Sequence, residues 1–181
     1  MSNAIITLAK KEVNSLFSSS VALLFLGIFS VFSVFSFFWL ETFFARNIAD
    51  VRGLFNLMPL LLIFIVAALT MRTWSEEIRS GTYEFLTTTS VSNFGLVIGK
   101  WLACLVMVGL ALASTLFIPI TVSFLGDLDW GPVITSYCGA FLVGATYASI
   151  GLYVSSKTEN QIVSFLITCL ICLAFYLVGS S

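Results

Sequence analysis

Charged and hydroxyl side chains that could do chemistry gather in one stretch of the chain, residues 72–86. It contains two Arg and three Glu between Arg72 and Glu84, whereas the whole 181-residue chain has only eight basic and nine acidic residues. Thr73 and Glu76 have the spacing of a capping box, in which a hydroxyl and a carboxylate bind the free amides of a helix start. The pattern predicts a short amphipathic helix at a membrane surface, with charges available to a partner. The simpler interpretation is a solvated loop whose charges only keep it out of the bilayer.

Catalytic and nucleotide-binding patterns are missing from the sequence. The chain has no His, which excludes imidazole metal ligands and His-based acid–base catalysis within it. A phosphate-binding loop needs four residues between its glycines and a Ser or Thr after the Lys. Here three residues separate Gly95 from Gly99, and Trp101 follows Lys100. We expect Lys100 to lie near a helix start among lipid headgroups, and we expect no catalytic, cofactor-binding or metal site in this chain.

The four cysteines lie in uncharged, apolar runs, where a free thiol packs as a small hydrophobic group. They are Cys104, Cys138, Cys169 and Cys172. We predict packing for all four, and neither a disulfide framework nor a metal site.

The composition indicates an integral membrane protein. Hydrophobic residues make up 59% of the chain, charged residues 9%, and the mean hydropathy is +1.08. A soluble domain has about a quarter charged residues. The apolar runs are uninterrupted, whereas a barrel strand alternates polarity over about ten residues. We therefore predict an all-α, polytopic transmembrane bundle, and the net charge of −1 gives no basic surface for nucleic acid.

The apolar runs divide the chain into the segments of a single transmembrane domain, residues 1–181. We expect an interfacial amphipathic helix at 1–20, spans at 21–41, 57–71, 97–125, 133–155 and 161–179, and a cytoplasmic loop at 72–93. A cleaved signal peptide is the alternative at the N-terminus, but about twenty uncharged residues from Val21 to Leu40 favour a span. Pro59 is expected in the first turn of the second span, where its missing N–H costs little. Pro119 is expected to bend the third span near its far end or to release a carbonyl there.

Two sets of small residues point to contacts inside the bundle. Three hydroxyls on the first span, those of Ser30, Ser33 and Ser36, could face a polar pathway or donate to their own backbone. The fourth span has small residues at every fourth position, a spacing that lets helices approach closely. We expect helix packing at Ala140, Gly144, Ala148 and Gly151.

The basic residues predict the orientation of the chain, because cytoplasmic loops of membrane proteins are enriched in Lys and Arg. With the N-terminus inside, six basic residues are cytoplasmic and two, Arg46 and Arg52, are outside. The cytoplasmic ones are Lys10, Lys11, Arg72, Arg79, Lys100 and Lys157. No ionisable residue is expected inside the spans, which argues against a carrier driven by protons or sodium.

The polar loop resembles a known family motif. Residues 76–86 read Glu-Glu-Ile-Arg-Ser-Gly-Thr-Tyr-Glu-Phe-Leu, and Val91-Ser92 and Gly99-Lys100 follow. The stretch is similar to the intracellular loop of ABC export permeases of the type-two superfamily, with the form E-E-x-x-S-G-T-x-E-x-L-L, then P-V-S and G-K. The gliding-motility type of permease is the nearest in character. The chain departs from the pattern at Thr87, where a second Leu is common, and at Ser90, where Pro is usual.

The resemblance implies a coupling helix that docks on a separate ATPase subunit. The interface residues it implies are Trp74, Glu76, Glu77, Arg79, Gly81, Thr82, Glu84, Phe85, Leu86 and Ser92. Expected partners are two ATPase copies that bind ATP and magnesium, a second permease copy or homologue, and membrane lipid. An additional envelope or accessory subunit is also allowed for. The family usually has a sixth helix, so this chain looks one span short.

Two functional hypotheses follow. In the first, the chain is the non-catalytic permease subunit of an ATP-driven exporter in the bacterial inner membrane, with a cytoplasmic N-terminus. In the second, it is a membrane scaffold that anchors an ATPase, motility or envelope complex without transport. Docking residues would be common to both, so the sequence does not separate them.

Overall fold

The computed structural model describes residues 2–40, 50–81 and 93–180, and every regular element in them is helical. Along the chain these are α1 Ser2–Ser18, α2 Ser20–Phe35, the π-helix η1 Ser36–Leu40, α4 Arg52–Thr70, α5 Ser75–Arg79, α7 Asn93–Ala113, α8 Phe117–Leu125, α9 Trp130–Ser155 and α10 Gln161–Ser180. The predicted all-α class is therefore confirmed for these residues.

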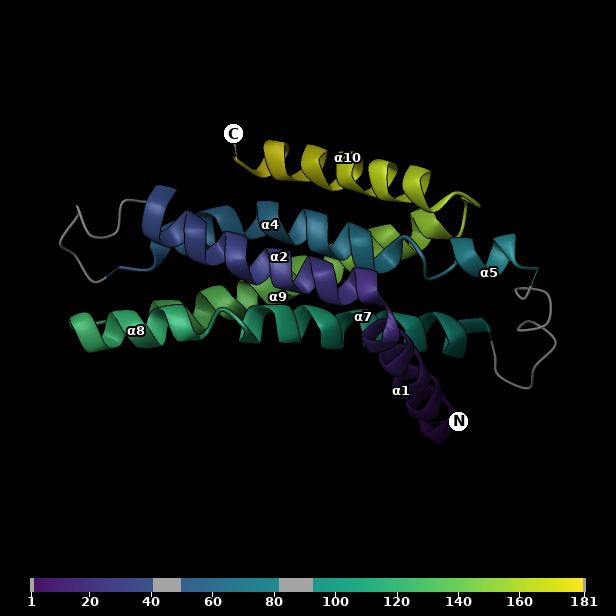
Figure 1. The fold of residues 1–181 in the computed structure, drawn as a ribbon, viewed down its shortest axis with the longest axis horizontal. Coiled ribbons are helices and arrows are strands. Elements are labelled where there is room, and N and C mark those ends of the chain that lie inside the picture. Colours follow the sequence, from purple (N-terminus) through teal and green to yellow (C-terminus); the bar gives the residue numbers. More distant parts are fainter. Residues whose placement is uncertain (1, 41–49, 82–92, 181) are drawn as a thin grey trace.

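Five helical segments in the described part are long and apolar enough to cross a membrane. They are Ser20–Trp39, Arg52–Arg79, Phe94–Leu125, Trp130–Ser155 and Gln161–Gly179. Their number is the predicted one, and they make the chain a helical, multi-pass membrane protein. In Figure 1 they run side by side along the long axis, while α1 projects from the bundle at an angle and α5 lies at one end.

Helix α4 is the centre of the bundle. Of its most apolar stretch 56% is buried, against 17% for α10, and it packs on α2, α9 and α10. Side chains such as Met58, Leu62 and Val66 are almost completely buried. Such a helix is apolar nearly all round, as expected for one enclosed by neighbours.

The second span begins earlier than predicted. Helix α4 begins at Arg52, so Pro59 lies inside the helix and not in its first turn. The Asp50 carboxylate accepts the backbone N–H of Arg52, which satisfies a free amide at the helix start. Leu54 is buried, so the additional turn belongs to the packed bundle.

The third span is broken. Helix α7 ends at Ala113, a turn covers residues 114–116, and α8 begins at Phe117. Pro119 lies in the first turn of α8, where its ring excludes a regular hydrogen bond to Thr115. The Thr115 carbonyl accepts the Ile118 N–H at 3.0 Å instead. The structure thus has a break about one turn before Pro119, where a bend was predicted.

Candidate functional site

The described part of the charged stretch, residues 72–81, contains α5 at the end of the bundle (Figure 1), after a turn at residues 71–74. Glu76 and Glu77 lie in its first turn and Arg79 in its last. This placement suits the helix dipole, since carboxylates face the positive end and the guanidinium the negative end. Gly81 follows with φ +72°, a left-handed conformation that ends many helices and favours glycine.

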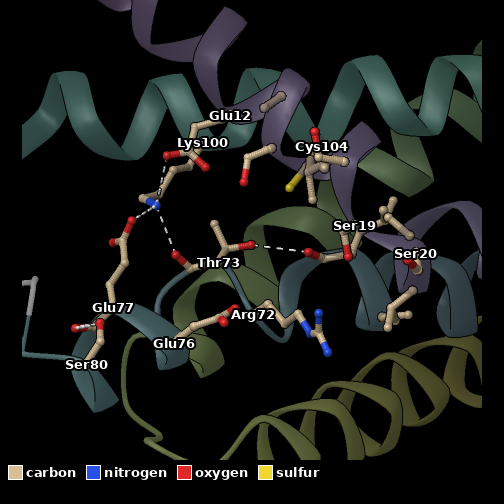
Figure 2. Close-up of a pocket in the computed structure, with 18 residues that line it drawn as sticks. Glu12, Ser19, Ser20, Arg72, Thr73, Glu76, Glu77, Ser80, Lys100 and Cys104 are labelled. Atoms are coloured by element: carbon tan, nitrogen blue, oxygen red, sulfur yellow. Dashed lines mark hydrogen bonds and ion pairs between the residues drawn. The ribbon is translucent and has the colours of Figure 1, made fainter.

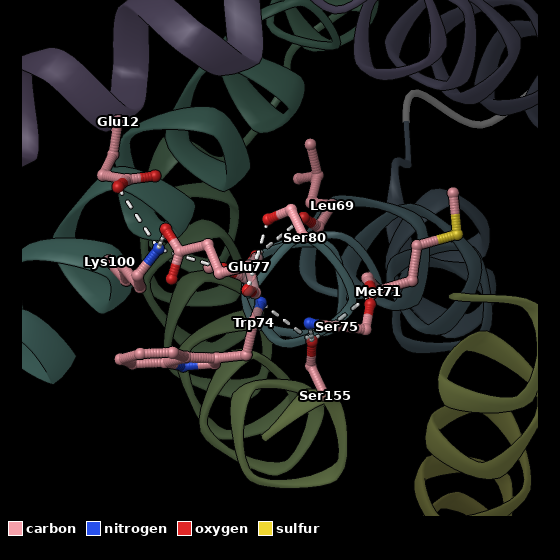
Figure 3. Close-up of polar contacts among 10 residues, drawn as sticks. Glu12, Leu69, Met71, Trp74, Ser75, Glu77, Ser80, Lys100 and Ser155 are labelled. Atoms are coloured by element: carbon pink, nitrogen blue, oxygen red, sulfur yellow. Dashed lines mark hydrogen bonds and ion pairs between the residues drawn. The ribbon is translucent and has the colours of Figure 1, made fainter. Parts of the chain in front are cut away.

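The predicted capping box does not form. The Thr73 hydroxyl donates to the Leu69 carbonyl at 3.2 Å, because Thr73 continues the winding of α4 and faces the preceding turn. The N-terminal residue Trp74 has no side-chain cap within α5. The amides of Trp74 and Ser75 instead donate to the Ser155 hydroxyl of α9, at 3.1 and 3.2 Å. A neighbouring helix therefore supplies the cap (Figure 3).

The Ser155 hydroxyl uses its whole hydrogen-bonding capacity at this cap. Besides accepting two amides, its hydroxyl donates to the Met71 carbonyl at 3.3 Å. A hydroxyl has one donor and two acceptor lone pairs, so the three bonds complete its capacity. The start of α5 is thereby attached to the end of α9.

Lys100 of α7 lies at the centre of the site and is only 2% exposed. Its Nζ donates to Glu77 Oε1 at 2.7 Å, to the Thr73 carbonyl at 2.9 Å and to Glu12 Oε1 at 3.2 Å. The ammonium thus uses its three donors on α5, the preceding turn and α1 (Figure 2). The prediction that Lys100 would lie among headgroups is wrong, because α7 begins at Asn93 and carries Lys100 about two turns into the protein.

Lys100 is also the seventh residue of the apolar segment Phe94–Leu125, so it lies near the charged end of that segment and not in its interior. Its burial is tolerated because both carboxylates approach it while their own side chains stay partly hydrated, 19% exposed for Glu12 and 23% for Glu77. The Trp74 ring lies 4.8 Å from the ammonium. A cation over an aromatic face adds a further favourable contact.

The predicted interface residues that the structure describes fall into two groups. Trp74 is buried and Glu77 half-buried, and both face Lys100. Glu76, Arg79 and Gly81 are exposed. The remaining predicted residues, Thr82, Glu84, Phe85, Leu86 and Ser92, lie outside the described part of the chain. Two residues predicted to meet a partner therefore hold α5 in place.

Sequence reasoning missed Glu12, Lys100 and Ser155 as members of this site. A signal for Glu12 was present, because it is the only acidic residue before Glu41. Ser155 had no such signal, since serines are frequent at helix ends. Their roles depend on residues that are distant along the chain.

A cavity of about 620 Å³ lies beside the Lys100 cluster (Figure 2). Four serines of the α1–α2 junction line it, together with five charged residues. The charged residues are Glu12, Arg72, Glu76, Glu77 and Lys100. Arg72 Nε donates to Gln161 Oε1 of α10 at 3.1 Å, which attaches the beginning of the polar stretch to a fourth helix. Among the described residues, no group of three or more His, Cys, Asp or Glu side chains could hold a metal.

The four small residues of α9 are all buried, and two lie at close helix contacts. A Cβ added at Gly144 would lie 2.6 Å from Val108 Cγ1 of α7, and one at Gly151 would lie 2.8 Å from Thr70 Cβ of α4. Ala140 and Ala148 are 7% and 0% exposed. Helix α9 can approach both neighbours only because these positions have little or no side chain.

Hydroxyls cross the bundle at the break between α7 and α8. Ser30 and Ser114 are 2.7 Å apart, and Thr115 Oγ1 is 2.9 Å from the Tyr137 hydroxyl. Ser30 and Ser33 also donate to their own helix, at Leu26 and Phe29. The backbone alternative is thus observed at Ser30 and Ser33, and Ser30 makes an interhelical bond as well. It is not observed at Ser36, whose buried hydroxyl has no hydrogen-bond partner among the described residues.

Comparisons of the chain with models of protein families, with curated proteins and with solved structures find no match. The chemistry of the site therefore has to be judged from its geometry. The contacts made by Lys100, Glu77 and Ser155 join α5 to other helices, so these residues suit an anchoring role. The exposed residues beside them suit contact with a partner.

Proposed function

We propose that the chain is the membrane-spanning permease subunit of an ATP-driven export complex, and that residues 72–93 dock a separate ATPase subunit. One observation carries the proposal: α5 is attached to three other helices. Lys100 joins it to α7 and, through Glu12, to α1, and Ser155 joins it to α9. A one-turn helix anchored in this way can transmit a push to the spans, whereas a solvated loop cannot.

The exposed side of α5 supports the docking role. Glu76 and Arg79 are exposed beside the buried anchor residues, so polar contacts with a partner would not disturb the bundle. The motif resemblance extends this surface through Thr82, Glu84, Phe85, Leu86 and Ser92. By the same resemblance, two ATPase subunits with ATP and magnesium would bind a pair of permease chains at a bacterial inner membrane.

The test is purification of the tagged chain from its native membrane. We expect an ATPase subunit to co-purify and to hydrolyse ATP in the complex. Gly81→Val is expected to lower ATPase stimulation, because a β-branched residue is strained at φ +72°. Glu84→Lys is expected to do the same by reversing a motif charge. Glu159→Lys, an equal reversal in the exposed turn after α9, is the matched control and should have no effect.

Two results would contradict the proposal. One is a purified complex without any nucleotide-hydrolysing subunit. The other is labelling of an Arg79→Cys variant by a membrane-impermeant maleimide in intact cells, since the loop would then face outward. A complex whose ATPase co-purifies but responds to neither Gly81→Val nor Glu84→Lys would support the scaffold hypothesis instead.

A further inference from the structure

The buried ammonium of Lys100 has one more carboxylate than it needs. Its side chain is 1% exposed, and both Glu77 and Glu12 contact its Nζ. One carboxylate would neutralise the charge, and the second adds repulsion between two like charges at short range. The two carboxylates come from different elements, α5 and α1, so one can leave while the other stays.

We propose that Glu12 is a reserve counter-ion that lets α5 swing away from α7 without leaving Lys100 unpaired. Separation of a buried ion pair is strongly disfavoured when it leaves an uncompensated charge. After Glu77 departs, the ammonium retains Glu12 and the Thr73 carbonyl, which precedes α5. The remaining pair is neutral, so the principal electrostatic barrier to displacement of α5 is removed.

The position of Glu12 does not depend on α5. Helix α1 crosses α7 and packs on it, and its Leu8 side chain fills the space beside Gly99, where a Cβ would lie 2.7 Å from Leu8 Cδ2. Glycine at this position allows the two helices to approach closely. Apolar contact with α7 therefore keeps α1 and Glu12 beside Lys100 when α5 is displaced.

The structure also shows that α5 is not close-packed on this side. The cavity of about 620 Å³ adjoins α5 and is lined by Glu76, Glu77 and Ser80 on that side and by Lys100 on the other (Figure 2). Displacement of α5 from α7 therefore does not have to break a close-packed interface beside the ion pairs. The Ser155 cap at the start of α5 and the left-handed Gly81 at its end provide the two points about which the helix turns.

This inference deepens the proposed function, since α5 is the proposed docking helix. Its test uses the full chain alone in detergent micelles. A failure there would leave ATPase docking in place, and absence of an ATPase would leave the counter-ion pair in place.

The first experiment is a double-substitution cycle, measured as the monodisperse fraction in size-exclusion chromatography. Glu77→Gln and Glu12→Gln should each retain most of the monodisperse protein, because one carboxylate remains. The double variant should lose it by about tenfold or more, since Lys100 is then buried without a counter-ion. Glu76→Gln, an exposed neighbour on α5, is the matched control and should resemble the wild type.

The second experiment measures the position of α5 by the distance between spin labels at Arg79→Cys and Lys157→Cys, with exposed Cys138 replaced by Ser. Glu77→Gln should move the distance distribution to a displaced component in otherwise folded protein. Glu12→Gln should reduce any displaced component. Glu12→Asp, which keeps the charge on a shorter side chain, serves if the Gln variant does not fold, and its displaced component should be no larger than that of the wild type.

Opposite results would overturn the proposal. If Glu77→Gln alone lost as much monodisperse protein as the double variant, Glu12 could not neutralise Lys100 by itself. If the two single effects simply added, the carboxylates would not substitute for each other. If removal of the Glu12 charge increased the displaced component, Glu12 would hold α5 in place and would not be a reserve.

Discussion

Two regions of this bundle join helices by different kinds of contact. The charged end consists of Glu12, Thr73, Trp74, Glu77, Lys100 and Ser155. The close-packed interior consists of Thr70, Val108, Gly144, Ala148 and Gly151. In the charged end, side chains reach across gaps and bind through hydrogen bonds and ion pairs. In the interior, the side chains of Val108 and Thr70 lie directly against the backbone of α9 at Gly144 and Gly151.

The difference teaches which region can rearrange. A close contact between a glycine and a β-branched side chain has one arrangement, because any displacement opens a void or creates a clash. Lys100 has several acceptors and can exchange one for another. Movement is therefore expected at the charged end and rigidity in the interior, and four substitutions test this contrast.

Removal of the central charge should have the largest effect. Lys100→Met leaves Glu12 and Glu77 facing each other without a cation, and it should destabilise the fold by about 3–5 kcal/mol. Unfolding titration with SDS in a fixed detergent measures the change. Lys157→Met, at an exposed position in the turn after α9, is the control and should change little. A Lys100→Met protein as stable as the control would remove the ion cluster as the anchor of the charged end.

Filling of the interior contact should come next. Gly151→Ala places a methyl group against Thr70, whose stiff β-branched side chain also donates to the Val66 carbonyl. Overpacking of this kind costs about 1–3 kcal/mol. Gly139→Ala on the same helix is the control, because nothing lies within 4 Å of its added Cβ. Equal stability of the two variants would show that α9 does not need close approach at Gly151.

Loss of the interhelical cap should have a smaller effect. Ser155→Ala leaves the amides of Trp74 and Ser75 without an acceptor, a change worth about 1–2 kcal/mol. Hydrogen exchange at the start of α5 should increase together with the loss of stability. The neighbouring variant Ser156→Ala removes only a bond to its own helix at Tyr153. Similar exchange in both variants would argue against a cap supplied by α9.

The smallest effect is expected at the break in the third span. Tyr137→Phe removes the bond to Thr115, and interhelical hydrogen bonds in membranes are worth about 0.6 kcal/mol on average. Tyr153→Phe, on the exposed side of α9, is the control. A loss larger than that of Lys100→Met would contradict this order, because the hydroxyls at the break would then outweigh the charged end.

The sequence was sufficient to predict the helical class, the five apolar segments and the small-residue stripe of α9. Each of these features depends on residues that are close together in the sequence, since a span requires about twenty consecutive apolar residues and a helix face repeats every three to four positions. Sequence reasoning misplaced Pro59 and failed to locate the break at residues 114–116, because the boundaries depend on contacts with neighbouring helices.

Only the tertiary structure decided how α5 is held. Lys100 meets Glu12 across 88 positions of the sequence and Glu77 across 23, and Ser155 meets Trp74 across 81. No pattern of neighbouring residues indicates which distant carboxylate will neutralise a lysine or which hydroxyl will cap a helix. The same Thr73 that matched a capping box donates elsewhere once α4 continues through it. Apolar length is a property of consecutive residues, whereas charge pairing depends on which segments packing brings together.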